Sequence, residues 1–325
     1  MKIRPIFAVY LLFALLITSC ASLPERSDRL SPADGTGVKN ILVINTNQTL
    51  ERYKVSQESF IETLKLTAAD NTRAISTIDL SMDNTPIETL QDVLNQRHFD
   101  AIYCIGAKAL GSIDYIDPDT QVVFSSVLSW RHFIEQPNYF GVASETAHEA
   151  QLTWFKYFFP ELRTIGVLYS SDNRALVKKA RQAASKLSIN IIAEEVASKA
   201  KLKAQTEDLL PKVDALWLIS DATVLGSTQQ AKQLFTLAHQ HQTPVLAYNP
   251  VFVEMGAIFS IAADTPTTGR QAALIMNNLL SGSSPESSIQ YPAGSHISVN
   301  LRKVREYNIE LNYNALDSVN SLIGE

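Results

Sequence analysis

The sequence is poor in cysteine, in unbalanced charge and in long apolar runs. Its 325 residues include two cysteines, Cys20 and Cys104, so the fold must depend on packing rather than on a disulfide framework. Lys and Arg total 28 against 33 Asp and Glu, with no block of like charge, which disfavours a nucleic-acid partner. The repeated long apolar runs of a multi-span membrane protein are missing. A large hydrophobic core is expected. Cys104 is either a small buried side chain of that core or a reactive thiol.

The motifs of common enzyme classes are also missing. The chain has no GxSxG, no GxxxxGK[ST], no GxGxxG after a strand and no HExxH, so hydrolase, nucleotide-binding and zinc-protease chemistry lack their local geometry. His239 and His241 stand two apart on an expected helix, where they point to different faces and make a poor metal pair. Glu145, His148 and Glu149 would share a helix face, which a solvated surface explains equally well. We expect no enzyme activity, no cofactor and no metal.

The first twenty residues have the features of an export signal. Lys2 and Arg4 precede an apolar run over residues 6–17 that is too short to cross a bilayer comfortably, and small residues then lead into Cys20. Residues 17–20 (ITSC) resemble the bacterial lipobox, in which the cysteine becomes the lipidated first residue of the mature protein. The alternatives are a plain secretory signal with an accidental cysteine, or a short anchor helix.

The lipobox resemblance implies a location in the cell envelope. Residues 1–19 would be removed as a signal peptide, and Cys20 would bind the protein to a membrane lipid so that it faces the periplasm. Ala21 after the cysteine resembles the enteric sorting rule for the outer membrane rather than the inner one. Residues 20–39 contain Pro and Gly without apolar periodicity, which predicts a flexible tether.

After the tether, short apolar runs alternate with amphipathic stretches. This alternation predicts parallel sheets with helices on both faces, an α/β fold. The strands are expected at residues 41–45, 74–80, 101–106, 121–127, 164–170, 189–196, 215–220 and 244–249. Residues 100–106 (DAIYCIG) and 214–220 (DALWLIS) echo each other, which favours two similar lobes related by duplication over a chance similarity of two buried strands.

Small polar residues follow many of these strands. Because ligands meet parallel sheets at the carboxyl ends of the strands, two facing sheets would form a cleft lined by such residues. Ser, Thr, Asp and Asn are also the usual helix caps and turn residues, so capping and ligand contact remain alternatives. The candidate ligand-binding residues are Thr46, Asn47, Gly106, Ser125, Ser126, Tyr169, Ser170, Asn173, Ser220, Asp221, Thr223, Tyr248 and Asn249.

Residues 164–311 resemble the substrate-binding proteins of the bacterial ABC transporter family that includes tryptophan and tyrosine uptake systems. The resemblance rests on TIGVLYSSDN, KVDALWLISDATV, TPVLAYNPVFVEMGAIFSI and GRQAALIMNNLLSG, and more loosely on HFDAIYCIGAKAL. It implies the type I periplasmic-binding fold, two Rossmann-like lobes joined by a multi-strand hinge. Lobe 1 would comprise residues 40–145 plus about 265–295, lobe 2 residues 146–264, and residues 296–325 would form a C-terminal segment that crosses the hinge.

The same resemblance implies where a ligand would be held. The cleft residues would fall on Ser125 and Ser126, on residues 170–173 and 220–223, and on residues 248–249. Relatives commonly carry an Asp-Asn pair followed by Thr where this chain has residues 221–223 (DAT), and the loop at residues 46–48 has no clear counterpart. An amino-acid-like ligand is therefore expected without a named amino acid.

Particular contacts can be suggested for such a ligand. Asp221 would accept bonds from an ammonium group, and Ser125, Ser126 and helix N-termini would hold a carboxylate. Tyr169, Tyr248 or Trp130 would supply an apolar wall, unless they belong to the core.

Two functions fit this reading. The protein would capture a small molecule between its lobes and present it to an ABC permease. Alternatively, it would sense the ligand and report it to a membrane receptor without transport. A neighbouring gene for a permease and ATPase would favour uptake, and a neighbouring receptor gene would favour sensing.

Overall fold

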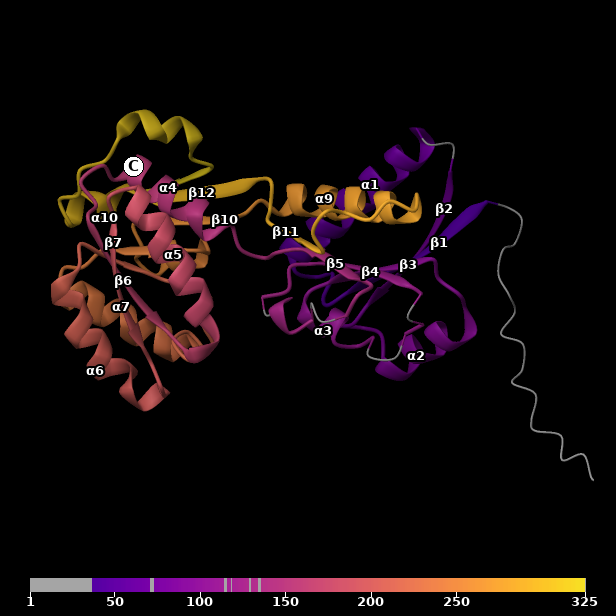
Figure 1. Ribbon diagram of the computed structural model, residues 1–325, viewed down its shortest axis with the longest axis horizontal. Coiled ribbons are helices and arrows are strands. Elements are labelled where there is room, and N and C mark those ends of the chain that lie inside the picture. The colour runs from indigo at the N-terminus through magenta and orange to yellow at the C-terminus, as the bar shows by residue number, and fades with distance from the viewer. Residues whose placement is uncertain are drawn as a thin grey trace, which may run out of the picture. The chain divides into compact units, whose positions relative to one another are not determined.

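The computed structural model describes residues 37–70, 73–113, 116–117, 119–128, 130–133 and 136–324. The signal peptide, Cys20 and most of the expected tether lie outside these ranges. Residues 37–325 form one unit, drawn in Figure 1. Within the described ranges, no helix has both the length and the apolarity to span a membrane.

Sheet A contains six strands in the order β11-β5-β4-β3-β1-β2, and all its neighbouring pairs are parallel. Its central strands β3 and β4 are buried except for Gln121 at the start of β4, as expected for a parallel sheet covered on both faces. The strands are β1 (Val38–Asn45), β2 (Ala74–Ser81), β3 (Ala101–Ile105), β4 (Gln121–Ser125), β5 (Tyr139–Val142) and β11 (Ile289–Gln290).

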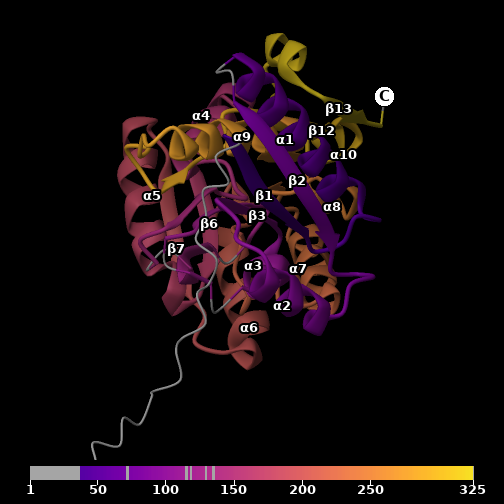
Figure 2. The ribbon, with the colours of Figure 1, turned by 90° about the vertical axis from the view of Figure 1, so that its right-hand side faces the viewer.

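Alternate residues of β1 face two separate cores. Ile41 and Val43 pack with α1 (Glu51–Asp70) and α9 (Thr265–Leu280) on one face. Leu42 and Ile44 pack with α2 (Ile87–Gln96) and α3 (Ala107–Leu110) on the other. Figure 2 shows α1 and α9 on one side of this sheet and α2 and α3 on the opposite side. We call sheet A with these four helices lobe 1.

Helices α1 and α9 cross at a glycine. A Cβ atom at Gly269 would lie 2.2 Å from the carbonyl oxygen of Ser56, so only glycine permits this approach. The close crossing brings the first turns of the two helices to the same end of lobe 1.

Sheet B contains seven strands in the order β13-β12-β10-β9-β8-β6-β7. Five run parallel, namely β6 (Thr164–Tyr169), β7 (Asn190–Glu195), β8 (Ala215–Trp217), β9 (Val245–Ala247) and β10 (Phe259–Ala263). β12 (Ser295–Asn300) pairs antiparallel with β10, and β13 (Ser321–Ile323) is parallel to β12. The antiparallel pair was not among the predicted strands.

Helices cover both faces of sheet B, which we call lobe 2 together with them. One face carries α4 (His148–Phe158) and α5 (Arg174–Lys186), and Phe155, Val177 and Trp217 are among its core residues. The other face carries α6 (Lys199–Leu209), α7 (Thr228–Gln240) and α8 (Val251–Glu254). Near the end of the chain stand α10 (Leu301–Glu306) and the 3₁₀ turn η4 (Tyr313–Ser318). Three more 3₁₀ turns are η1 (Trp130–His132), η2 (Ser171–Asn173) and η3 (Leu210–Lys212).

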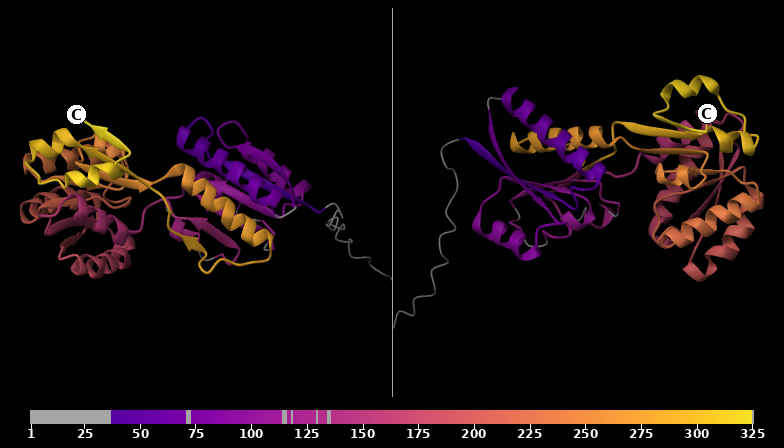
Figure 3. Two further views of the ribbon diagram at one scale, coloured as in Figure 1. Left: turned by 90° about the horizontal axis from the view of Figure 1, so that it is seen from above. Right: turned by 180° about the vertical axis from the view of Figure 1, so that it is seen from behind.

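The described chain passes between the two sheets at residues 143–147, at residue 264 and at residues 291–294. Consequently α9 and β11 belong to lobe 1, although they follow β10 of lobe 2. Residues 295–323, which fall largely in the segment expected to cross the hinge, lie along sheet B as β12, α10, η4 and β13, as Figure 3 shows. The two sheets are mostly parallel and each is flanked by helices, which confirms the predicted α/β fold class.

Candidate functional site

The loops after β1 and β3 form the rim of lobe 1, and their polar residues hold the backbone. Thr46 Oγ1 accepts a hydrogen bond from the Ala109 amide at 3.1 Å, and Asn47 Oδ1 accepts one from the Thr49 amide at 2.8 Å. Gly106 has a φ of +89°, and a Cβ atom there would lie 2.5 Å from Thr46 Oγ1. Thr46 and Gly106 therefore fix the two loops against each other, and Asn47 stabilises the turn of its own loop.

The two serines at the end of β4, Ser125 within the strand and Ser126 after it, have different environments. Ser125 is fully buried, and its hydroxyl lies 2.7 Å from the Tyr103 hydroxyl and 3.3 Å from that of Ser56. Burial raises the pKa of Tyr103 to about 12, despite its hydrogen bonds to Ser125 and Ser56. Ser126 has a φ of +58°, a left-handed conformation that turns the chain, and it lines the cavity between the lobes. Of this pair, only Ser126 lines the cavity.

Asp221 organises the rim of lobe 2. Its Oδ2 accepts hydrogen bonds from the Ser170 amide, the Ser170 hydroxyl and the Asn173 side chain at 2.6, 2.8 and 2.8 Å. Its Oδ1 accepts bonds from the amides of Thr223 and Val224 at 2.9 and 3.1 Å. Burial opposes ionisation of this carboxyl, but the hydrogen bonds outweigh burial and lower its pKa below 3.8. Asp221, predicted as an acceptor for a ligand ammonium, thus has both oxygens engaged within lobe 2.

The other predicted residues of this rim belong to the same network or to the core. Asn173 Nδ2 also donates to the Ser220 carbonyl oxygen at 3.1 Å. Tyr169 packs against the core of lobe 2. Ser170, Asn173, Ser220, Asp221 and Thr223 therefore join the loops after β6 and β8.

A cavity of about 390 Å³ lies between the lobes. Three predicted residues line it: Ser126, Tyr248 and Asn249. Asn249 Oδ1 accepts a hydrogen bond from the Val251 amide at 3.0 Å, and burial raises the pKa of Tyr248. The whole lining is Arg52, Tyr53, Ser126, Leu128, Ser144, Tyr248, Asn249, Pro250, Ala262, Ala263, Asp264, Thr265, Pro266, Thr268 and His296.

Several lining residues were missed by the sequence analysis. Arg52 and Tyr53 belong to the first turn of α1, and the Arg52 guanidinium lies 4.6 Å from the Tyr53 ring centroid. Leu128 leaves 53% of its surface exposed, unusual for an apolar residue this close to a buried strand. His296 lies on β12, whose antiparallel return could not be read from strand patterns. The signal available for Arg52 was its place just after a predicted strand end.

The crossing at residues 143–147 carries a buried carboxylate. Both oxygens of Glu145 accept from Trp130 Nε1, at 3.2 and 3.1 Å, and Arg131 forms an ion pair with Glu145 at 2.9 Å. Trp130, suggested as a ligand wall, is buried in this contact and is absent from the cavity lining. Glu145 and His148, for which a solvated helix face was one explanation, are both buried, whereas Glu149 is exposed. In the described ranges, no three His, Cys, Asp or Glu side chains are grouped to hold a metal ion.

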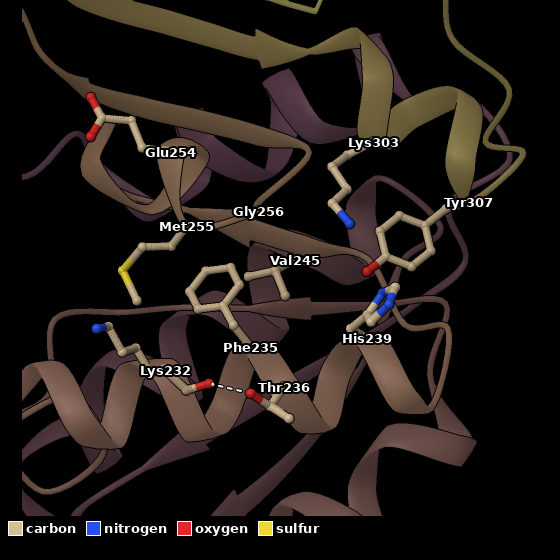
Figure 4. A pocket seen from close by; sticks show the side chains of 10 residues that line it. All are labelled: Lys232, Phe235, Thr236, His239, Val245, Glu254, Met255, Gly256, Lys303 and Tyr307. Atoms are coloured by element: carbon tan, nitrogen blue, oxygen red, sulfur yellow. Dashed lines mark hydrogen bonds between the residues drawn. The ribbon is translucent and has the colours of Figure 1, made fainter.

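Lobe 2 has a second cavity, of about 590 Å³, at the other end of its sheet (Figure 4). The Phe235 ring forms part of its floor, between the ammonium groups of Lys232 and Lys303. Lys303 is paired with Glu306 at 2.7 Å. Because Val245 begins β9, this cavity lies at the amino ends of the parallel strands. The interlobe cavity instead adjoins their carboxyl ends, the usual position for ligands in such sheets.

Two α/β lobes, joined by several crossings and enclosing a cavity at their strand carboxyl ends, define a type I periplasmic-binding fold. The chain belongs to the ABC transporter substrate-binding protein family, whose sequence model matches residues 87–322. No protein with a curated description is significantly similar to the chain in sequence.

Solved structures show the same fold. A ligand-free, open substrate-binding protein with adhesive properties from Clostridium difficile is 17% identical, with a TM-score of 0.67 over 88% of this chain and 100% of that one. A Streptococcus pneumoniae ABC domain in complex with L-Trp is 18% identical, with a TM-score of 0.58 over 88% of this chain and 99% of that one. A conserved domain protein from Vibrio cholerae is 18% identical, with a TM-score of 0.59 over 87% of this chain and 99% of that one.

Proposed function

We propose that this protein captures a small, amino-acid-like molecule in the interlobe cavity and presents it to an ABC importer. The observation that carries the proposal is the cavity of about 390 Å³, which is lined by residues of lobe 1, of lobe 2 and of the crossings between them. Its size and its mixture of apolar and polar side chains suit a metabolite.

Capture by this arrangement follows from where the lining residues stand. Ser126 and Leu128 belong to lobe 1, and Tyr248 and Asn249 to lobe 2. A ligand that contacts both pairs has a higher affinity for a closed arrangement of the lobes, and its binding shifts the population toward closure. A closed protein would present a composite surface to a permease. A receptor would serve as the partner in the sensing alternative.

The proposal includes a lipid anchor at Cys20, which would hold the protein at the envelope facing the periplasm. We expect Cys20→Ser to move the protein from the membrane fraction to the soluble fraction of cells that express the full chain. An unchanged membrane fraction would instead indicate an uncleaved anchor or another attachment.

A thermal-shift screen tests the proposed ligand class. The protein from residue 23 onward contains the whole unit of residues 37–325, and it would be screened against amino acids, nucleosides, purines and short peptides. A ligand at 100 times its dissociation constant stabilises the folded state by about 2.7 kcal/mol. The complex of a related domain with L-Trp makes aromatic amino acids the first to test. If amino acids leave the melting temperature unchanged and another class raises it, the amino-acid-like ligand is wrong.

A further inference from the structure

The interlobe cavity contains one side chain of fixed positive charge, Arg52. Within the described part of the chain, Arg52 forms no ion pair, and its contacts are with its neighbour Tyr53. Arg52 Nη2 donates to the Tyr53 hydroxyl at 3.3 Å, and the guanidinium stacks over the same ring. Stacking holds the guanidinium in place while most of its N–H donors stay available to a ligand.

Two helix N-termini lie beside this positive charge. Arg52 and Tyr53 belong to the first turn of α1, and Thr265, Pro266 and Thr268 to the first turn of α9. The crossing at Gly269 holds the two helices together, and both first turns line the cavity. The α9 end is already capped by the Asp264 carboxylate, which accepts from the Thr267 amide, so the macrodipole of α1 is the one that favours a further anion. A ligand carboxylate is therefore expected beside Arg52.

The cavity also contains one carboxylate, Asp264. Its Oδ2 caps α9 by accepting from the Thr267 amide at 3.0 Å and the Thr267 hydroxyl at 2.5 Å. Arg270 Nη2 is 3.8 Å from the same oxygen and donates to the Thr267 hydroxyl at 2.7 Å. The second oxygen, Oδ1, accepts no hydrogen bond from the described residues. Asp264 therefore retains one acceptor for a ligand ammonium.

Apolar surface accompanies the two charges. Leu128 is half-exposed, and the ring of Tyr248 is held 5.5 Å from that of Phe252 in a T-shaped pair. Ala262 and Ala263, which are small and apolar, also line the cavity. The lining thus offers a cation, an anion and an apolar wall.

From this combination we infer that the cavity is a zwitterion site for a free α-amino acid with an apolar side chain. Arg52 holds the α-carboxylate, Asp264 accepts from the α-ammonium, and Leu128 and Tyr248 contact the side chain. This inference rests on the proposed function and names the recognition elements of the same cavity.

The test uses three forms of one molecule. The L-amino acid that stabilises the mature protein most is compared by calorimetry with its amide, which lacks the carboxylate, and with its deaminated acid, which lacks the ammonium. We expect each change to weaken binding about tenfold or more, as for loss of a charge-assisted hydrogen bond. An amide or a deaminated acid that binds as tightly as the amino acid overturns the inference.

Variants then assign each charge to its residue. Arg52→Gln should weaken binding of the amino acid about tenfold and no longer discriminate against the amide. Asp264→Asn, which retains a capping side chain for α9, should no longer discriminate against the deaminated acid. Lys54→Gln is the control, because Lys54 is exposed on the same helix outside the cavity lining. If the Arg52 variant still discriminates fully against the amide, or the Asp264 variant against the deaminated acid, the inference is overturned while amino-acid capture stands. If the wild-type protein binds no amino acid, both the inference and the proposed function are overturned.

Discussion

At the scale of single residues, Asp221 shows how a candidate ligand contact can serve the protein itself. Its five hydrogen bonds join the loop after β6 to the loop after β8. Without this carboxylate, the amides of Ser170, Thr223 and Val224 would lose their acceptors. The rim of lobe 2 would then lose its shape before any ligand arrived.

Asp221→Ala should therefore lower the free energy of unfolding of the unliganded protein by about 3 kcal/mol, because buried donors lose a charged acceptor. The folded-state pKa lies below 3.8, so this contribution is present above that value and disappears as pH falls through the folded-state pKa. Urea unfolding at pH 7 and at pH 3 measures both effects, with the exposed Asp172→Ala as control. Lost ligand binding with unchanged unliganded stability would instead make Asp221 a direct ligand contact.

His148 should give the protein a pH dependence of its own. Burial, and secondly the charge of Arg131, lower its pKa from 6.5 to about 4. Between these values the unfolded chain binds a proton that the folded protein does not, so stability falls as pH drops from 6.5 to 4. The loss amounts to about 3 kcal/mol at most. Urea unfolding at several pH values across this interval measures the effect. For His148→Gln, the free energy of unfolding should depend less steeply on pH than in the wild type, whereas for the exposed control His241→Gln it should keep the wild-type pH dependence.

The sequence predicted which polar residues stand at the strand ends better than which of their side chains reach the cavity. Polar residues after strands were identified because parallel sheets place their carboxyl ends together. Ser125 and Ser126 are chemically identical, yet Ser125 is fully buried whereas Ser126 lines the cavity. They differ because Ser126 has a left-handed backbone conformation, with a positive φ. Arg52 was missed because a charged residue at a helix start is ordinarily a surface residue. Its place in the cavity depends on α9, which lies more than 200 residues away in sequence and lines the same cavity.

At the scale of elements, the crossing at residues 143–147 is held from both sides. Glu145 is bound by Trp130 and Arg131 of η1 in lobe 1. The carbonyl oxygen of the next residue, Thr146, accepts from Gln151 of α4 in lobe 2 at 2.8 Å, and Trp217 of β8 donates to Gln151 at 3.0 Å. This crossing is thus fixed to lobe 1 through Glu145 and to lobe 2 through Thr146.

Glu145→Ala should release the lobe-1 side of this crossing. We expect a loss of about 2 kcal/mol in the free energy of unfolding, since the Trp130 indole N–H loses its buried acceptor while half-exposed Arg131 is partly screened by solvent. Ligand affinity should also fall, because Ser144 of the cavity lining donates to Glu145 at 3.0 Å. Chemical unfolding and calorimetry measure the two effects. Glu149→Ala, an exposed glutamate four residues later, should change neither.

Element prediction from the sequence worked where hydrophobic periodicity was strong. The eight predicted strands all correspond to strands of the two sheets, although β8 and β9 are only three residues long. β5, β10, β11, β12 and β13 were missed. The pairing of β10 with β12 joins residues on either side of the segment in which the chain returns to lobe 1 as α9 and β11, and local patterns carry no information about such a long-range pairing.

At the scale of the whole molecule, the two lobes have separate cores. The residues packed on sheet A and those packed on sheet B fall into different clusters. Chain crossings and a ligand are what couple them, so a ligand that contacts both lobes should make their unfolding more cooperative.

A buried thiol can report this coupling. Cys104 is fully buried in lobe 1, and burial raises the pKa of its thiol, so it reacts only after lobe 1 opens. In moderate urea we expect a saturating ligand to slow labelling of Cys104 as strongly as it slows hydrogen exchange of the β6 and β8 amides in lobe 2. Slower exchange in lobe 2 alone would mean that the ligand binds one lobe. Cys104→Ser, with Cys20 absent, gives the unlabelled baseline.

The order of elements along the chain also affects how the protein is made. Lobe 1 begins at β1, yet Ala272, Ala273, Ile275 and Met276 of α9 complete the core on one face of its sheet. During synthesis, that face would be covered by α1 alone until all five parallel strands of lobe 2 had left the ribosome. Lobe 1 therefore cannot complete its core until most of lobe 2 has been made, and a chaperone that shields the incompletely covered face of its sheet would be most useful in that interval.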